Sequence, residues 1–528
     1  MLLSFLFASL TLTPKSDGFL IESFTYAGAG ERVVVEATHH PSRWWNIAEV
    51  RKGEEYRFSH LFRNNYIRFA AFDAKGREVD VSAEDVKLCK REYGFMRHYG
   101  KETWEEKLKR VASWQHDRFG MFIHFGLYSL PARHEWCQSR EMIAAESYQR
   151  YFDNFNPDRL DARKWAKAAK RAGMRYAVIT TKHHDGFCLW DSAYTDFKST
   201  KTRFGRDIVR EFTDAFRAEG LKVGFYYSLL DWHHPDYTID QQHPLRPSKD
   251  FDWSKASRKD VDRMNAGRDM SRYRKYMKDQ IKELLTNYGR IDVLWYDFTS
   301  EGRYYGQGKS RHDWDSEGLL ALTRKLQPHV IVNNRLGISD WEDGWDFLTR
   351  EQKRDDQLPT WGGRAWPWES CQTFSGSWGY YRDEHSWKSR FQILEQLIQT
   401  VSQSGNLIMN IGPTGAGEID SRAMERLNDY GEWMAVNSAS IYGCGRASDE
   451  LLKNRIPNTL YTWNPKTKKL YVHFLAWVYG RIFVPFAERV KYAQLLNDRS
   501  EVEVDGEGYL ILPLEKPPVE IPVVEFSL

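Results

Sequence analysis

The feature that most constrains the fold is an alternation of strand-like and helix-like segments over residues 120–411. Seven apolar runs have the composition of buried strands: 120–126, 176–184, 222–228, 291–297, 330–335, 345–351 and 406–411. Amphipathic helical patterns lie between several of them, at 161–172, 206–219, 273–288 and 317–326. Strands and helices that alternate in this way form parallel sheets joined by crossovers. The pattern favours a (β/α)8-like barrel with one poorly signalled strand; a doubly wound sheet is the alternative, but no GxGxxG follows the first strand.

Shorter strand-like segments flank this region on both sides. Residues 18–98 contain the runs 33–35 and 66–72, and a turn at 73–76, and predict a small N-terminal β accessory domain. A charged amphipathic helix over 101–118 then opens the barrel domain, which we place at 99–443. Beyond it the helical pattern stops. Strand-like runs at 459–463, 469–474, 501–504 and 508–512 predict a C-terminal antiparallel β-sandwich over 444–528.

The first seventeen residues have two interpretations. Met1 to Leu12 form an apolar run that is too short to span a membrane and long enough for the core of a signal peptide. The run lacks a basic segment and a small-x-small cleavage site, so a first buried strand is the alternative. We expect a secreted, periplasmic or lysosomal-type location rather than a cytoplasmic one.

Charge and composition exclude several classes of protein. The 528 residues include 76 Lys and Arg against 73 Asp and Glu, a net charge of +3, which argues against a nucleic-acid binder. Mean hydropathy is −0.65, and no stretch reaches the ~20 apolar residues of a membrane span. Aromatic residues make up 15%, which excludes disorder and suits either large cores or contact with the C–H faces of sugars. Five scattered cysteines without a CxxC pair predict neither a disulfide scaffold nor a zinc ribbon.

Reactive side chains collect where the predicted strands end. In chain order they are His124, His183, His184, Asp185, Tyr226, Tyr227, Asp231, Trp295, Asp297, Arg335, Glu351 and, just after the sixth strand, Glu369. Barrel enzymes build their active sites from the carboxyl ends of the strands. We therefore expect these side chains to line one site.

Carboxylates among aromatic residues suggest hydrolysis of a glycosidic bond. Asp297 follows an apolar strand and Trp295, which suits a fixed, ionised nucleophile, and Arg335 is a candidate to keep it ionised. Glu351 suits a general acid, provided that partial burial raises its pKa.

The histidines are compatible with two functions, hydrogen bonding to sugar hydroxyls and metal binding. No HExxH motif is present, and His183 and His184 point to opposite faces if the strand continues through them. His183 and His184 can therefore bind the same metal ion only if the strand ends before them. We expect no metal and no cofactor, and a metal-dependent barrel hydrolase that uses His124, His183 and His184 is the alternative.

Several short segments together resemble the α-L-fucosidases of glycoside hydrolase family 29. They are 118–126 (RFGMFIHFG), 134–136 (HEW), 181–187 (TKHHDGF), 226–228 (YYS), 231–232 (DW), 294–297 (LWYD), 334–335 (NR), 368–371 (WESC), 377–380 (SWGY) and 405–413 (GNLIMNIGP). The resemblance runs from about residue 104 to 445, and more loosely over the C-terminal segment. The N-terminal β segment lies outside the usual family core.

The resemblance implies an exo-acting retaining hydrolase that removes terminal α-L-fucose from oligosaccharides or glycoconjugates through a covalent fucosyl-enzyme. It implies that Asp297 is the nucleophile. It implies substrate contacts by His124, Glu135, Trp136, His183, His184, Tyr227, Trp295 and Arg335. Because fucose carries a methyl group in place of a 6-hydroxymethyl group, its pocket needs an apolar wall as well as hydrogen-bonding groups.

Two glutamates match the general acid in different members of the family. The Glu of a Thr-x-Glu segment matches Glu351, and the Glu of a Trp-Glu segment matches Glu369. We prefer Glu351 as the acid/base, with Glu369 as the alternative. A catalytically silent glycan-binding protein is a third hypothesis, but it predicts the loss of a carboxylate, and Asp297, Glu351 and Glu369 are all present.

Overall fold

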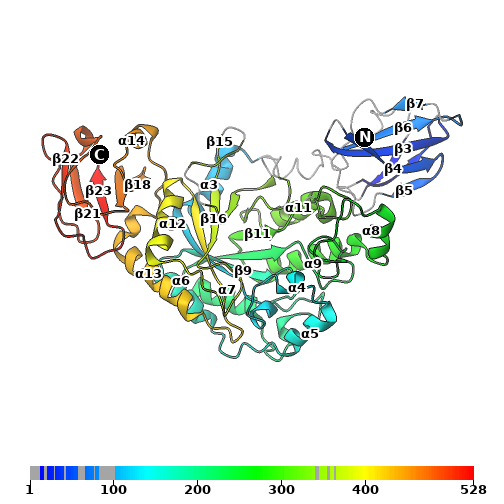
Figure 1. Cartoon of the computed structure of the whole chain (residues 1–528), viewed down its shortest axis with the longest axis horizontal. Coiled ribbons are helices and arrows are strands. Elements are labelled where there is room, and N and C mark those ends of the chain that lie inside the picture. The colour runs from blue at the N-terminus through cyan, green and yellow to red at the C-terminus, as the bar shows by residue number, and fades with distance from the viewer. Residues whose placement is uncertain are drawn as a thin grey trace.

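An eight-stranded parallel sheet forms the centre of the molecule, with antiparallel sheets from the two ends of the chain on either side of it (Figure 1). The computed structural model describes residues 12–16, 21–28, 30–40, 43–57, 66–75, 78–81, 102–300, 302–338, 344–353, 357–361 and 364–528. None of the helices in these ranges is long and apolar enough to cross a membrane.

The central sheet curls into a (β/α)8-like barrel, as the alternation predicts. In the order of their hydrogen bonding its strands are β12 (Ile331–Val332), β11 (Val293–Asp297), β10 (Lys222–Ser228), β9 (Tyr176–Lys182), β8 (Phe119–Ile123), β17 (Asn406–Ile411), β16 (Trp368–Thr373) and β13 (Leu348–Glu351). All of these neighbouring pairs are parallel. Their carboxyl ends therefore meet at one rim of the barrel.

The barrel closes along a seam between β12 and β13, where the described residues form a single parallel bridge from Asn333 to Phe347. The buried carboxylate of Asp346 strengthens this seam. It binds Arg110 at 2.6 Å and Arg324 at 2.7 Å, and accepts a hydrogen bond from the amide of Val332 at 2.8 Å. Burial raises the pKa of Asp346, but the two guanidinium groups lower it further, to below its ordinary value.

Helices follow most of the strands and cover the outside of the barrel. They are α3 (Trp104–Asp117), which precedes the first strand, α4 (Cys137–Arg140), α5 (Ala145–Asp153), α6 (Ala162–Arg171), α7 (Ile208–Ala218), α8 (Arg258–Met264), α9 (Met270–Asn287), α10 (Arg311–Trp314), α11 (Ser316–Leu326), α12 (Arg390–Ser402) and α13 (Ser421–Asn437). Single 3-10 turns lie at Leu127–Ser129 and Ser199–Lys201.

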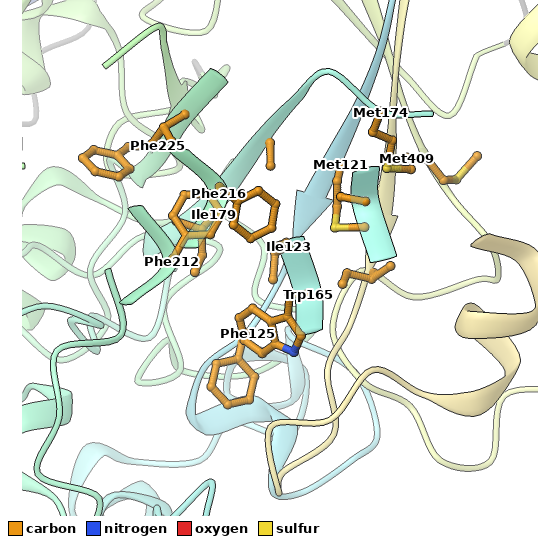
Figure 2. Close-up of a cluster of buried hydrophobic side chains, with 14 of the residues drawn as sticks. Met121, Ile123, Phe125, Trp165, Met174, Ile179, Phe212, Phe216, Phe225 and Met409 are labelled. Atoms are coloured by element: carbon orange, nitrogen blue, oxygen red, sulfur yellow. The ribbon is translucent and has the colours of Figure 1, made fainter. Parts of the chain in front are cut away.

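Alternate residues of each strand face the two sides of the barrel wall. Figure 2 shows the outer side, where Ile123, Ile179 and Phe225 lie among Trp165 of α6 and Phe212 of α7. The inner side forms a separate cluster of buried side chains: Phe122, Tyr176, Val178, Tyr226, Val293, Trp295, Ile331, Phe347, Cys371 and Ile408, with Val111 and Trp114 of α3. The carboxyl rim of the barrel therefore stands on a filled core.

The strand that the sequence signals poorly is β16. Its residues Trp368 to Thr373 carry polar side chains on both faces, so they lack the apolar pattern of a buried strand. The hairpin of β14 (Thr360–Trp361) and β15 (Arg364–Ala365) occupies the connection from β13, where a regular barrel has a helix. Residues 345–347, expected in the sixth strand, precede β13.

The N-terminal strands form two antiparallel sheets. One consists of β1 (Leu12–Ser16), β2 (Ile21–Tyr26) and β5 (Glu55–Arg57), and the other of β4 (Arg43–Arg51), β3 (Arg32–His40), β6 (Tyr66–Phe72) and β7 (Glu78–Val81). Residues 1–11 lie outside the described residues, and a signal peptide at 1–17 stays a prediction.

The C-terminal strands also form two antiparallel sheets, with a shared apolar core that includes Leu470, Val472 and Leu510. The larger sheet holds β18 (Thr459–Asn464), β19 (Lys469–Phe474), β23 (Val523–Ser527) and β21 (Tyr492–Leu495), and the smaller holds β20 (Gly480–Phe483) and β22 (Tyr509–Leu512). The expected strand 501–504 contributes only isolated bridges at Glu501 and Val504. A short helix, α14 (Asp449–Lys453), follows the point where the helical pattern was expected to stop.

Candidate active site

Asp297 is the last residue of β11, and both of its carboxylate oxygens have partners. The Tyr226 hydroxyl donates to Oδ2 at 2.7 Å, and Nη1 of Arg335 lies 2.9 Å from Oδ1. The residue is only 8% exposed. Two donors on opposite oxygens fix the orientation of this carboxylate at the rim of the barrel.

Arg335 joins Asp297 to the second carboxylate predicted from the sequence. Its Nη2 lies 2.6 Å from Oε2 of Glu351, and its Nε donates to the hydroxyl of Thr349 at 3.1 Å. The Glu351 side chain is 42% exposed, whereas that of Asp297 is 12% exposed. One guanidinium therefore spans a buried carboxylate and an accessible one.

Glu369 occupies a different environment, inside the barrel in β16. It is fully buried, and its oxygens accept hydrogen bonds from Tyr176 at 2.6 Å and from the indole nitrogen of Trp295 at 2.8 Å. Burial raises the pKa of Glu369 to about 7, and the two hydrogen bonds oppose that rise. Glu369 is thus enclosed by side chains of the barrel core. Its contacts indicate that it holds Trp295 in place and does not itself stand at the accessible rim.

The raised pKa of Glu369 predicts a pH dependence of stability. An unfolded glutamate ionises near pH 4.5, whereas the folded one stays protonated to about pH 7, so folding loses stability as pH rises between these values. Glu369→Gln removes this loss. We expect the free energy of unfolding of the variant, relative to wild type, to improve by about 3 kcal/mol from pH 4.5 to 7. Urea unfolding measures this difference at each pH. The same difference in unfolding free energy between variant and wild type at pH 4.5 and at pH 7 would contradict the assignment.

Two histidines of the rim are held in a defined tautomer. His124 donates from Nδ1 to the side-chain oxygen Oδ1 of Asn410 at 2.6 Å, since the amide nitrogen of Asn410 itself donates to the backbone carbonyl of Trp378. His184 donates from Nδ1 to the hydroxyl of Ser228 at 2.7 Å, since that hydroxyl itself donates to the carbonyl of Leu230. Burial lowers the pKa of His124 to about 4 and that of His184 to about 3, so both rings are neutral at pH 7. Each presents Nε2 as a hydrogen-bond acceptor.

His183 lies between the other two histidines. Because β9 ends at Lys182, the side chains of His183 and His184 do not alternate across a sheet, and their ring centroids lie 4.0 Å apart. The ring of His124 lies 5.5 Å from that of His183. Within the described ranges, no group of three or more His, Cys, Asp or Glu side chains has a metal-binding arrangement.

Glu135 and Trp136 come from the loop after β8. One oxygen of Glu135 accepts hydrogen bonds from the amides of Trp378 at 3.2 Å and Gly379 at 2.9 Å. The other, Oε1, is buried 3.2 Å from Nδ1 of His134, but that nitrogen accepts from the amide of Trp136, so Oε1 has no hydrogen-bond donor among the described residues. Trp136 packs against Trp232, His184 and Phe298, with ring centroids 4.8–5.4 Å apart. The site therefore combines free acceptors with an aromatic wall.

The structure separates Tyr227 from the other predicted site residues. In the register of β10 and β11, Tyr226 pairs with Trp295 and Ser228 with Asp297, so these four face the inside of the barrel. Tyr227 faces outward, and its hydroxyl donates to Gln280 of α9 at 2.7 Å. Tyr226, rather than the predicted Tyr227, is therefore the tyrosine that contacts Asp297.

A pair of variants tests this register. Tyr226→Phe removes a hydrogen bond to a charged oxygen of Asp297, and we expect kcat/KM on an aryl α-L-fucoside to fall about 10- to 100-fold. Tyr227→Phe removes a hydrogen bond to Gln280 and should lower stability by about 1 kcal/mol while kcat/KM changes less than twofold. Equal kinetic losses in the two variants would contradict the placement.

Other residues of the site were not assigned from the sequence. Asn410 orients His124 and donates to the backbone carbonyl of Trp378, whose ring lies tilted against that of His124 with centroids 5.1 Å apart. Phe298 follows Asp297 with a φ of +81°, a backbone strain that holds its ring beside Trp136. Asn410 and Trp378 lie in segments that carry the family resemblance, and Phe298 directly follows the predicted nucleophile, but none of the three was assigned a role in advance.

A parallel barrel with two carboxylates on one arginine at its carboxyl rim, next to an aromatic wall, defines the class of barrel glycoside hydrolases. Comparison with known proteins gives the family. The α-L-fucosidase family model matches residues 90–439, and the chain belongs to that family.

Curated relatives and solved structures agree with this assignment. The chain is 30% identical to human plasma α-L-fucosidase over 77% of this chain and 84% of that protein. It resembles the structure of α-L-fucosidase isoenzyme 1 from Paenibacillus thiaminolyticus with a TM-score of 0.73 and 42% identity, over 80% of this chain and 99% of that one. A Bacteroides thetaiotaomicron α-L-fucosidase, solved as a trapped covalent intermediate, gives a TM-score of 0.67 at 27% identity, over 79% of this chain and 95% of that one.

Proposed function

We propose that this protein is a retaining α-L-fucosidase that uses Asp297 as nucleophile and Glu351 as acid/base. The observation that carries the assignment is the pairing of a buried carboxylate with an accessible one on Arg335. Retaining glycosidases hold their two carboxyl groups only about 5–5.5 Å apart, and a shared guanidinium favours such close placement.

In the first step, an oxygen of Asp297 attacks C1 of fucose and Glu351 gives its proton to the departing glycosidic oxygen. The products are a fucosyl ester of Asp297 and the shortened glycan. Tyr226 and Arg335 keep Asp297 oriented for this attack. In the second step, Glu351 takes a proton from water, the water oxygen attacks C1, and the ester bond to Asp297 breaks.

The accessibility of Glu351 supports its role over that of Glu369. The acid/base has to reach the leaving oxygen in one step and a water molecule in the next. Glu351 stands at the exposed end of β13, whereas Glu369 is enclosed by Tyr176 and Trp295. To donate its proton, Glu351 has to leave the ion pair with Arg335, which its position at a strand end permits.

The remaining groups suit a terminal fucose. Acceptors at His124, His184 and Glu135 face a substrate whose hydroxyls donate hydrogen bonds, and the aromatic wall of Trp136 and Phe298 suits an apolar methyl group. The substrate is a fucosylated oligosaccharide or glycoconjugate. Because named relatives include plasma fucosidases, we also place the protein outside the cytoplasm.

Hydrolysis of 4-nitrophenyl α-L-fucoside, with the released sugar followed by proton NMR, tests this function. We expect release of 4-nitrophenol, α-L-fucose as the first anomer and unchanged rates after treatment with a chelator. First appearance of the β anomer would exclude retention, and loss of activity in chelator would favour a metal-dependent hydrolase.

A further inference from the structure

A hollow lies on the face of the barrel where the carboxyl ends of the strands meet. Two loops line it, one after β10 and one after β11, and its volume is about 480 Å³. Both loops start at the carboxyl ends of the strands that carry Tyr226 and Asp297. We call this hollow the side groove. Its volume lies within the range of roughly 300–1,000 Å³ that is typical of small-ligand sites, which leaves room for sugar rings.

Two cations line the side groove without a carboxylate partner in the described residues, Arg246 and Lys249. Nη1 of Arg246 donates to the hydroxyl of Ser139 at 3.2 Å and to the carbonyl of His243 at 3.0 Å, both neutral groups. Three of the five N–H donors of this guanidinium therefore remain. Burial lowers the pKa of Arg246, which means that its charge has lost part of its hydration. A bound anion would stabilise that charge.

Three nearby acidic groups, Asp240, Asp252 and Glu141, are already paired. The carboxylate of Asp252, which also lines the groove, lies 3.0 Å from Lys255 and accepts hydrogen bonds from Ser254. Glu141, which feels the charge of Lys249, is bound by Arg133 at 2.6 Å. Asp240, whose charge acts on Arg246, is paired with the buried Lys309. With two cations and one anion in its lining, the groove presents a net positive charge.

The rest of the lining suits a sugar. Tyr304 is 37% exposed, and the rings of Phe251 and Trp253 pack edge to face with centroids 5.0 Å apart. Gln307 joins the two loops by donating to Gln241 at 3.0 Å. Aromatic faces, amides and unpaired cations together match the C–H faces, hydroxyls and anionic substituent of one class of ligand, acidic saccharides.

Helix α4 links Trp136 of the candidate active site to the lining of the side groove. This helix begins directly after Trp136, and its Ser139 donates to the carbonyl of Gln242 at 2.6 Å and binds Arg246. Arg246 therefore lies against the helix that follows Trp136, and we expect a glycan that extends past Trp136 to reach it.

We propose that the side groove binds an anionic saccharide unit, sulfated or carboxylated, of the glycan whose terminal fucose occupies the catalytic pocket. The link to fucose rests on the proposed function, whereas binding in the groove does not require turnover. The two proposals are therefore tested by separate measurements on the same preparation.

Calorimetric titration with unfucosylated tetrasaccharides tests the groove. The probes are chondroitin 4-sulfate, which carries sulfate and carboxylate, hyaluronan, which carries carboxylate alone, and chitotetraose, which is neutral. We expect at least one anionic probe to bind and chitotetraose not to bind detectably. If hyaluronan binds, a carboxylate is sufficient for recognition by the groove. If only chondroitin 4-sulfate binds, the sulfate group is required.

Charge variants locate the binding. Lys249→Gln, at an exposed side chain, should weaken binding of the anionic probe about fivefold, and Arg246→Gln with Lys249→Gln more than tenfold. The matched control, Arg163→Gln with Lys167→Gln on the exposed face of α6, should bind as wild type does. Absence of binding by both anionic probes, equal binding of chitotetraose, or equal losses in the α6 control would overturn the proposal. Aryl fucoside hydrolysis by the wild type reports on the proposed function independently.

Discussion

Asp297→Ala is expected to lower kcat on 4-nitrophenyl α-L-fucoside by about 10⁴-fold or more, because the variant lacks the oxygen that bonds to C1. The change also leaves Tyr226 and Arg335 without their shared acceptor. Added azide should restore part of the rate, since the small anion enters the space of the carboxylate and attacks C1 directly. The product is then β-fucosyl azide, of inverted configuration.

A control on the same polypeptide segment separates chemistry from folding. Asp292 lies just before β11, at the opposite end of the barrel, where it accepts a hydrogen bond from the amide of Val223. Asp292→Ala should keep kcat within about twofold of wild type. Retention of substantial activity by Asp297→Ala, or azide rescue with retained configuration, would exclude Asp297 as the nucleophile.

Glu351→Ala is expected to produce the second-largest effect, and that effect should depend on the leaving group. Loss of a general acid costs about 10²- to 10⁴-fold. The loss should be largest for a fucosylated oligosaccharide, whose sugar alcohol needs a proton to depart, and smaller for 4-nitrophenyl fucoside. Azide should now give α-fucosyl azide, because Asp297 still forms the ester and azide replaces water in the second step.

Glu369→Gln is the comparison for this experiment. If Glu369 supports Trp295 from inside the core, its variant should show neither the dependence on leaving group nor rescue by azide. The opposite pattern, with rescue of a Glu369 variant and an unaffected Glu351→Ala, would exchange the two roles.

The fold could be predicted from the sequence wherever one face of a segment is uniformly apolar. β10 and β17 lie at their predicted positions because consecutive buried residues define them. β16 escaped prediction because Glu369 lies inside the barrel and is satisfied there by Tyr176 and Trp295, partners that are distant in sequence. Local pattern carries no information about such a partner.

The site could be predicted to the level of the strand end, and less well to the level of the side chain. The structure places His124, Asp297 and Arg335 at the rim, because a parallel barrel brings all strand ends together, and their roles stay predictions. The prediction that Tyr227 lines the site does not fit its position, because two adjacent tyrosines do not reveal from the sequence which of them faces the inside of the barrel. Asp297 and Trp295 are two residues apart and so share the inner face of β11. Tyr226 pairs with Trp295 and therefore shares that face, but this pairing of β10 with β11 is known only from the structure.

The most direct test of the central claim is to trap the covalent intermediate with 2-fluoro-fucosyl fluoride and to map the label by mass spectrometry. The account predicts one fucosyl label on the tryptic peptide 291–303, which contains Asp297, with fragment ions that place the label on that residue. A label on the peptides that carry Glu351 or Glu369, or inactivation without any label, would contradict it.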